Sequence, residues 1–380
     1  MINKLVNKDI DSIDRLLLSI PLVNKYYSKN AAKIKKNYYL SLHHLNILKP
    51  NFVLWLSTYA CNLKCPFCEA NAGKESVDEL TTNDAKNLID ELKNMKTRRL
   101  VISGGEPLIR KDIFEIMEYA NTKNIEIGLL SNGVNVKKHW DKLKNIKYFF
   151  FLTSIDGTKK YHDGIRELNN SFDAALESLE FFKSIKVPTR MIKTVVTPGN
   201  IDDIENIYNV IKSSAATRWE VSPVSVVGRA AENDKFSLNS RQLQFLINFI
   251  NNTKTEFPAD ISESHSYLGC FQDWPIGKPF FCGAGLTRCA IMPNGEILGC
   301  NQIYDLNKSE GNIKNEKLSY IWKNNFKSFR NNSKNKICNE CKFWNSCQGG
   351  CWAELENKES CLKSIWFDYQ NSINNSNSYY

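Results

Sequence analysis

Short apolar runs alternate along the chain with longer segments of helical period, beginning at residue 52. The first apolar run is Phe52–Leu56. The segment Asn83–Asn94 after it carries four apolar residues on one helical face, namely Ala85, Leu88, Ile89 and Leu92. Thr82, directly before that segment, is the predicted helix N-cap. Strands that alternate with helices form parallel sheets, so the pattern predicts repeated strand and helix units.

Five further units follow the first. Their predicted strands are Arg99–Ser103, Ile125–Leu130, Tyr148–Ser154, Thr189–Thr197 and Trp219–Val224. Six parallel strands make an open or partial barrel rather than a closed eight-unit barrel. We therefore expect an α/β fold, a partial (β/α)6 TIM-like barrel over residues 51–255.

The two ends of the chain depart from this pattern. Residues 1–50 are rich in Lys, Tyr and Leu, and we expect a helical arm that packs outside the barrel. After about residue 255 the periodicity weakens and Gly, Pro and Trp become frequent. This change predicts a domain boundary and a separate cysteine-rich domain over residues 256–380.

Composition and charge exclude several classes of protein. With 380 residues, 42% of them hydrophobic, the chain is neither collagen-like nor disordered. The net charge of +9 is spread out, so we expect no nucleic-acid partner. No apolar run approaches the ~20 residues of a membrane span, and Met1–Asp14 lacks a signal-peptide pattern. We expect a cytoplasmic protein without a membrane partner.

The 12 cysteines are the abnormal feature of the composition. A chain of this length can bury a full apolar core and does not need disulfide bonds. In a reducing compartment, closely spaced cysteines indicate metal or redox chemistry.

Three of these cysteines, Cys61, Cys65 and Cys68, form a C-x3-C-x2-C motif directly after the first strand. Loops at this end of a parallel barrel carry its chemistry. Three thiolates at this spacing can hold three corners of a four-iron cubane and leave the fourth iron open. A zinc knuckle or three buried thiols is the alternative.

Polar residues also end the next strands. The second strand runs into Gly104-Gly105-Glu106-Pro107, where two glycines allow a ligand to approach the backbone and Glu106 can bind an amino group. The third and fourth strands end at Ser131-Asn132-Gly133 and Ser154-Ile155-Asp156-Gly157. The ends of parallel strands share one rim, so these groups are expected on that rim.

Together, C-x3-C-x2-C with Phe67 before its third cysteine and the later Gly-Gly-Glu-Pro resemble the radical S-adenosylmethionine (SAM) enzymes over residues 52 to about 250. The resemblance implies a [4Fe–4S] cluster whose open iron chelates SAM. It further implies reductive cleavage of SAM to a 5'-deoxyadenosyl radical that abstracts hydrogen from a substrate.

The resemblance also implies roles for individual residues. Glu106, within Gly104–Pro107, would bind the methionine amino group of SAM. Four residues, Ser131, Asn132, Ser154 and Asp156, would lie near its ribose and methionine portion. Arg166 ends a segment, Tyr161–Arg166, similar to the one whose arginine pairs with the methionine carboxylate. A surface arginine at a helix start is the alternative for Arg166.

The remaining cysteines resemble the seven-cysteine SPASM extension, which implies two auxiliary [4Fe–4S] clusters. The matching positions are Cys282, Cys300, Cys338, Cys341, Cys347, Cys351 and Cys361, with Gly295 five residues before the second. By resemblance, the distal cluster takes Cys338, Cys341, Cys347 and Cys361, and the inner one Cys282, Cys300 and Cys351. Cys289 is the expected fourth inner ligand and Cys270 the alternative; without either, an iron is open to substrate. Zinc at the C-x2-C spacing is a further alternative.

The sequence indicates the class of substrate less clearly than it indicates the cofactors. The resemblance favours a ribosomally made peptide that receives a crosslink, a thioether or an epimerised residue. A haem or tetrapyrrole precursor, or another small molecule, is the second hypothesis, and a non-enzymatic zinc or redox protein the third. Asn301 stands where formylglycine-forming relatives carry an aspartate base, which argues against sulfatase maturation.

We expect a reductant such as flavodoxin or ferredoxin. The first 50 residues are too short for a winged-helix recognition domain, so a leader peptide would be bound by the barrel, the arm or a separate protein.

Overall fold

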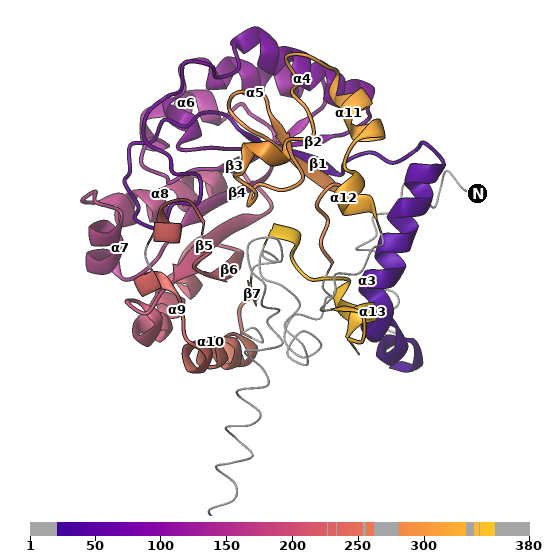
Figure 1. The fold of residues 1–380 in the computed structure, drawn as a ribbon. Coiled ribbons are helices and arrows are strands. Elements are labelled where there is room, and N and C mark those ends of the chain that lie inside the picture. The colour runs from indigo at the N-terminus through magenta and orange to yellow at the C-terminus, as the bar shows by residue number, and fades with distance from the viewer. Residues whose placement is uncertain are drawn as a thin grey trace, which may run out of the picture. The chain divides into compact units, whose positions relative to one another are not determined.

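The computed structural model describes residues 21–225, 227–232, 234–253, 256–261, 281–331, 338–341 and 343–353 (Figure 1). They fall into two compact units. The larger holds the described residues of 45–262 and 283–331, and the smaller those of 1–44, 263–282 and 332–380.

A nine-stranded sheet forms the larger unit, in the order β7-β6-β5-β4-β3-β2-β1-β8-β9 (Figure 1). Every neighbouring pair is parallel except β8 with β9. The strands are β1 (Phe52–Leu56), β2 (Arg99–Ser103), β3 (Glu126–Leu130), β4 (Tyr148–Ser154), β5 (Arg190–Val196), β6 (Arg218–Pro223), β7 (Ala259–Ile261), β8 (Arg288–Ile291) and β9 (Ile297–Leu298). All six predicted strands are confirmed.

Two edges of this sheet differ from the prediction. β7 extends it beyond β6, and β8 pairs with β1 in the register Val53 with Cys289. The expected six-strand barrel left β1 as an edge, where unpaired backbone groups need a partner. β8, from the region expected to form the C-terminal domain, supplies that partner.

The larger unit also contains the helices between the strands and two helices that follow β9. They are α4 (Thr82–Asn94), α5 (Ile113–Thr122), α6 (Trp140–Leu143), α7 (Lys159–Ile165), α8 (Ser171–Ser184), α9 (Ile204–Lys212), α10 (Ser240–Thr253), α11 (Leu318–Asn324) and α12 (Lys327–Arg330). Short 3-10 turns are η1 (Pro107–Ile109), η2 (Lys137–His139), η3 (Ile201–Asp203), η4 (Gly228–Glu232), η5 (Asp234–Phe236) and η7 (Leu306–Lys308).

The first of these helices begins one residue earlier than predicted. Thr81, not Thr82, is the N-cap of α4: its hydroxyl accepts from Asp84 N at 3.2 Å, and Asp84 Oδ2 accepts from Thr81 N at 2.9 Å. This reciprocal capping box satisfies two N–H groups at the helix start. The Thr82 hydroxyl instead donates to Asp112 at 2.7 Å.

Strand alternation divides the side chains between two faces of the sheet. Phe151 faces the helices, because its ring stacks on Phe182 of α8 at 3.8 Å. Ser154, Lys193 and Glu220 are register partners on β4, β5 and β6 and form one row on the opposite face.

In the smaller unit, α3 (Pro21–His44) packs against α13 (Trp344–Cys347). Tyr27, Ala31 and Tyr39 recur at helical spacing and are buried, and the Tyr39 ring stacks on Phe281 at 5.6 Å. The predicted helical arm thus packs on the C-terminal cysteine region, a contact its sequence pattern does not predict. Within the described ranges, no helix is long and apolar enough to span a membrane.

Candidate active site

The three cysteines of the C-x3-C-x2-C motif lie on one closed loop between β1 and α4. Cys61 N donates to Gly73 O at 3.0 Å and Gly73 N donates to Tyr59 O at 2.8 Å, which joins the two ends of the loop. Inside it, Cys68 N donates to Cys65 O at 3.2 Å. The loop therefore holds Cys61, Cys65 and Cys68 on one connected piece of backbone.

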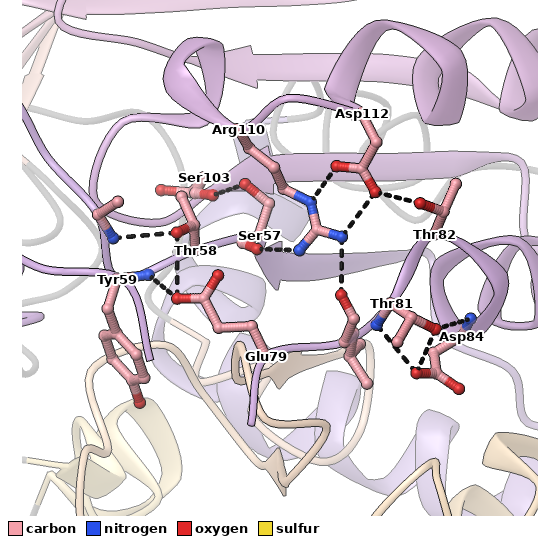
Figure 2. Close-up of polar contacts among 12 residues, drawn as sticks. Ser57, Thr58, Tyr59, Glu79, Thr81, Thr82, Asp84, Ser103, Arg110 and Asp112 are labelled. Carbon is pink, nitrogen blue, oxygen red and sulfur yellow. Dashed lines mark hydrogen bonds and ion pairs between the residues drawn. The ribbon is translucent and has the colours of Figure 1, made fainter. Parts of the chain in front are cut away.

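Glu79 and Arg110 fix the base of this cysteine loop (Figure 2). Glu79 Oε1 accepts from Tyr59 N at 2.8 Å before the cysteines and from Ser76 N at 3.1 Å after them. Arg110 donates to Ser57 O and to Leu80 O, each at 2.7 Å. Neither residue was predicted for the site, since nothing in the local sequence indicates a partner so far along the chain.

The glycine pair after β2 packs against the same loop. Gly105 N donates to Thr58 O at 2.7 Å and Glu106 N to Ala60 O at 2.8 Å. A Cβ at Gly104 would lie 2.5 Å from Thr58 O, and one at Gly105 2.1 Å from Ala60 O. The two glycines therefore allow two backbone segments to pack closely, and a ligand contact at Gly104 and Gly105 stays a prediction.

Glu106 lies at the centre of the predicted rim and is fully buried. Its Oε1 accepts from Ser131 Oγ at 2.9 Å and from Leu108 N at 3.0 Å, and its Oε2 accepts from Asn132 N at 2.8 Å. Burial raises the pKa of the carboxyl, and these bonds act against that rise. Pro107 opens η1, which presents the Leu108 N–H.

Asn132 connects this carboxylate to the cysteine loop. While its backbone N–H binds Glu106, its side-chain Nδ2 donates to Asn62 Oδ1 at 2.9 Å. Asn62 directly follows Cys61. The structure thus brings the predicted residues of β2 and β3 together beside the first cysteine.

Asp156 and Arg166 form a buried ion pair. Arg166 Nε and Nη2 lie 2.7 and 2.6 Å from Asp156 Oδ2, and Asp156 Oδ1 accepts from Val195 N at 2.9 Å. Arg166 is 7% exposed, so the alternative of a surface arginine is wrong. The sequence named both residues but not their pairing.

Other residues of the segment Tyr161–Arg166 support this pair. His162 Nδ1 accepts from Asp156 N at 3.1 Å, and the Tyr161 hydroxyl bonds Thr197 Oγ1 at 3.0 Å. Asp163 accepts from Phe172 N at 2.8 Å, which satisfies an N–H group at the start of α8.

An apolar cluster encloses the middle cysteine. Phe67, Val224, Ala230 and Phe236 form the cluster, and Cys65, Ile165 and Val195 pack against it. Ile165 precedes Arg166, and Val195 bonds Asp156, so the ion pair is adjacent to the cysteine loop. Burial raises the pKa of Cys65, and it raises that of Cys61 to about 11.

The row formed by Ser154, Lys193 and Glu220 contains a charged pair that was not predicted from the sequence. Lys193 Nζ lies 3.6 Å from Glu220 Oε1, beside Ser154 in register. Burial lowers the pKa of Lys193, but the carboxylates of Glu220, Glu69 and Asp156 raise it by more. The sequence did contain a signal for this pair, because Lys193 and Glu220 are charged residues inside two neighbouring predicted strands.

The predicted auxiliary cysteines lie in both units. Cys289 is 1% exposed inside β8, and burial raises the pKa of its thiol to about 12. Cys300 follows β9 and is half-buried. In the smaller unit the described cysteines are Cys282, Cys338, Cys341, Cys347 and Cys351. Cys270 and Cys361 lie outside the described residues.

Among the described residues, Cys61, Cys65 and Cys68 are free cysteines. No three His, Cys, Asp or Glu side chains of these residues come together as a site for a metal ion. The first loop nevertheless suits a cluster by its donor set, since three unpaired thiols share one clamped and shielded loop.

Comparisons with protein families agree with this geometry. A model of the radical SAM superfamily matches residues 55–211, and one of the SPASM iron–sulfur cluster-binding domain matches residues 282–342. The chain thus carries a radical SAM domain followed by a SPASM domain. As a radical SAM enzyme with a SPASM domain, it has SAM and iron–sulfur clusters as cofactors.

Two kinds of curated protein are among its relatives. Mycofactocin maturase MftC of Mycobacterium tuberculosis is 28% identical over 311 residues, 80% of this chain and 78% of the maturase. The AdoMet-dependent heme synthase of Methanosarcina barkeri is 27% identical over 320 residues, 79% of this chain and 90% of the synthase.

Among solved structures, Streptococcus suis SuiB bound to S-adenosylmethionine matches with a TM-score of 0.67 and 20% identity. The match covers 89% of this chain and 80% of SuiB. At this identity the match concerns the fold, and it agrees with the radical SAM barrel.

Proposed function

We propose that this radical SAM/SPASM enzyme modifies a ribosomally synthesised peptide, by crosslinking, thioether formation or epimerisation. The observation that carries the proposal is the convergence of the cysteine loop, Glu106 and the Asp156–Arg166 pair at the carboxyl ends of β1–β4. Mycofactocin maturase is 28% identical over 80% of this chain, and this similarity supports a peptide as the substrate class. A solved complex of the fold relative SuiB with its precursor peptide SuiA is consistent with it.

In this proposal Cys61, Cys65 and Cys68 hold the catalytic [4Fe–4S] cluster. Together, the cluster and SAM supply one-electron chemistry that removes a hydrogen atom from the substrate. Burial favours the neutral form of Cys61 and Cys65, so these thiols release their protons as metal binds.

Glu106 and Arg166 are the proposed contacts to the methionine end of SAM. An ionised carboxylate has about four acceptor sites, and three protein donors occupy three of them on Glu106. The fourth is available to an ammonium group. Arg166 directs Nε and Nη2 at Asp156, so its other N–H groups are the ones to bind a carboxylate.

Other residues have supporting roles in the proposal. Ser131 and Asn132 hold Glu106 through hydrogen bonds. Ser154 remains a proposed contact to the ribose and methionine portion of SAM. Phe67, Val224 and Phe236 enclose Cys65 and exclude water from its surroundings.

The assignment of the C-terminal cysteines to two auxiliary clusters stays a prediction from their resemblance to the SPASM pattern, and Cys289 is tested separately below. We propose a flavodoxin or ferredoxin as the reductant and the cytoplasm as the location, where free thiols persist.

A tetrapyrrole is the second candidate substrate. It is favoured by the AdoMet-dependent heme synthase, whose match spans 90% of the synthase. The two candidates differ in the molecule consumed, so one experiment can separate them.

Anaerobic reconstitution followed by SAM and a reductant tests the enzyme class. We expect about twelve irons per chain for three clusters of four, and formation of 5'-deoxyadenosine. Cys65→Ala should abolish 5'-deoxyadenosine formation while leaving about eight irons. Normal formation by this variant would overturn the cluster assignment.

Substrate class follows from the same enzyme incubated with two probes. One is the short peptide encoded beside the gene, and the other is iron coproporphyrin. A peptide that loses hydrogen atoms by mass spectrometry, or that gains deuterium from D2O at an epimerised residue, would support the maturase. Loss of carboxylates from the porphyrin, with an unchanged peptide, would replace it with the second candidate.

A further inference from the structure

Arg229 is far from the cysteine loop in the sequence, but it holds that loop through hydrogen bonds. It lies in η4, after β6, and its Nε donates to Cys65 O at 2.8 Å. Its Nη1 donates to Ala72 O at 2.7 Å and to Asn71 Oδ1 at 3.3 Å. One guanidinium thus bridges the middle cysteine and the end of the loop, a geometry that a planar fork of donors provides.

The backbone of η4 adds a second attachment. Arg229 N donates to Cys68 O at 3.1 Å. Gly228 before it has a φ of +58°, and a Cβ there would lie 2.3 Å from both Cys68 O and Glu69 O. Only glycine permits this approach, so the turn is built to bring Arg229 against the loop.

The surroundings of Arg229 keep it in place. Ala230 is 1% exposed and belongs to the apolar cluster with Phe67 and Phe236, against which Cys65 packs. Arg229 itself is half-buried. Its charge is therefore held beside Cys65 by packing on one side and by backbone acceptors on the other.

We propose that Arg229 is a positioning residue for the catalytic cluster: it holds the ligand loop in shape and places a cation beside Cys65 that raises the cluster's reduction potential. A nearby positive charge favours the reduced cluster, which carries one more electron. This inference rests on the proposed cluster at Cys61, Cys65 and Cys68.

Two substitutions separate the two parts of the role. Arg229→Gln removes the charge and the bridge between Cys65 and Ala72. Arg229→Lys keeps the charge but cannot reproduce the planar two-nitrogen contact. Arg190→Gln is the matched control, because Arg190 likewise donates to two carbonyl groups, Ala215 O at 2.7 Å and Val187 O at 2.6 Å, at the opposite end of β5.

The experiment uses the full chain with its clusters loaded. An EPR-monitored redox titration follows the cluster whose signal changes on adding SAM, and a chelator challenge measures how fast its iron is lost. For Arg229→Gln we expect a more negative potential and faster iron loss. For Arg229→Lys we expect a potential near that of the unsubstituted protein with faster iron loss, and for Arg190→Gln neither change.

Each other outcome contradicts part of the proposal. Unchanged potential and iron loss in Arg229→Gln would overturn it, and so would equal shifts in Arg190→Gln. If Arg229→Gln does not fold, Arg229→Lys with unchanged iron loss overturns the holding role. An unsubstituted protein without a SAM-responsive cluster would instead overturn the proposed function, so the two failures are distinguishable.

Discussion

Asp156 binds the Arg166 guanidinium through a single oxygen, Oδ2, while its other oxygen binds the Val195 N–H. The carboxylate therefore links β5 to the arginine proposed to bind SAM. Both side chains are buried, so each charge depends on the other for compensation.

Asp156→Asn should lower the free energy of unfolding by about 3 kcal/mol, because it leaves the Arg166 cation buried without a counter-charge. Anaerobic guanidinium unfolding followed by circular dichroism measures the change. Asp141→Asn is the control, since Asp141 pairs with Lys144 at 2.7 Å on the surface, and little change is expected. Equal effects of the two substitutions would contradict a structural role for the buried pair.

Gly105→Ala should disrupt the cysteine loop. Its Cβ would lie 2.1 Å from Ala60 O, and hydrogen bonds on both sides prevent the two segments from moving apart. We expect a cost of about 3 kcal/mol or more and a loss of about four irons per chain. Gly73→Ala, in the same loop with nothing within 4 Å, should keep its iron. Full iron content in Gly105→Ala would show that the contact is dispensable.

His162 should make stability fall as the pH is lowered. Burial, with Arg166 nearby, lowers the pKa of His162 to about 4, whereas the unfolded residue titrates near 6.5. Between these values the unfolded chain takes up a proton that the folded protein does not, so acid favours unfolding. The contribution between pH 7 and pH 5 is about 2 kcal/mol.

His162→Asn keeps an acceptor for the Asp156 N–H without a titrating ring. Unfolding free energies at pH 7 and pH 5 should therefore differ less in this variant than in the unsubstituted protein. An identical pH dependence in both proteins would rule out His162 as its source.

Cys289→Ala tests whether this residue is a ligand. Cys289 is the predicted fourth inner ligand, but its side chain is buried within β8 at 1% exposure, and the residue pairs with Val53 of β1. We expect unchanged iron content and a small loss of stability from the missing sulfur atom. Cys300→Ala is the control that should lose iron. An equal loss of iron in Cys289→Ala would show that Cys289 is a ligand after all.

The sequence predicted the parts of this protein that depend on neighbours along the chain. Strand and helix periodicity located all six strands, with ends within one residue of β5 and β6. It did not locate β8, because four residues of strand within a cysteine-rich region carry too little pattern. The N-cap of α4 was displaced by one residue because Thr81 and Thr82 offer the same hydroxyl.

By itself, then, the sequence determined the donor groups: the C-x3-C-x2-C thiols, Glu106 and Arg166. The tertiary structure decided what holds each of them. Arg229 reaches Cys65 across 164 residues, and Asp156 claims two nitrogens of Arg166. Local propensity depends on adjacent side chains, whereas these contacts depend on which loops the parallel strands bring to one rim.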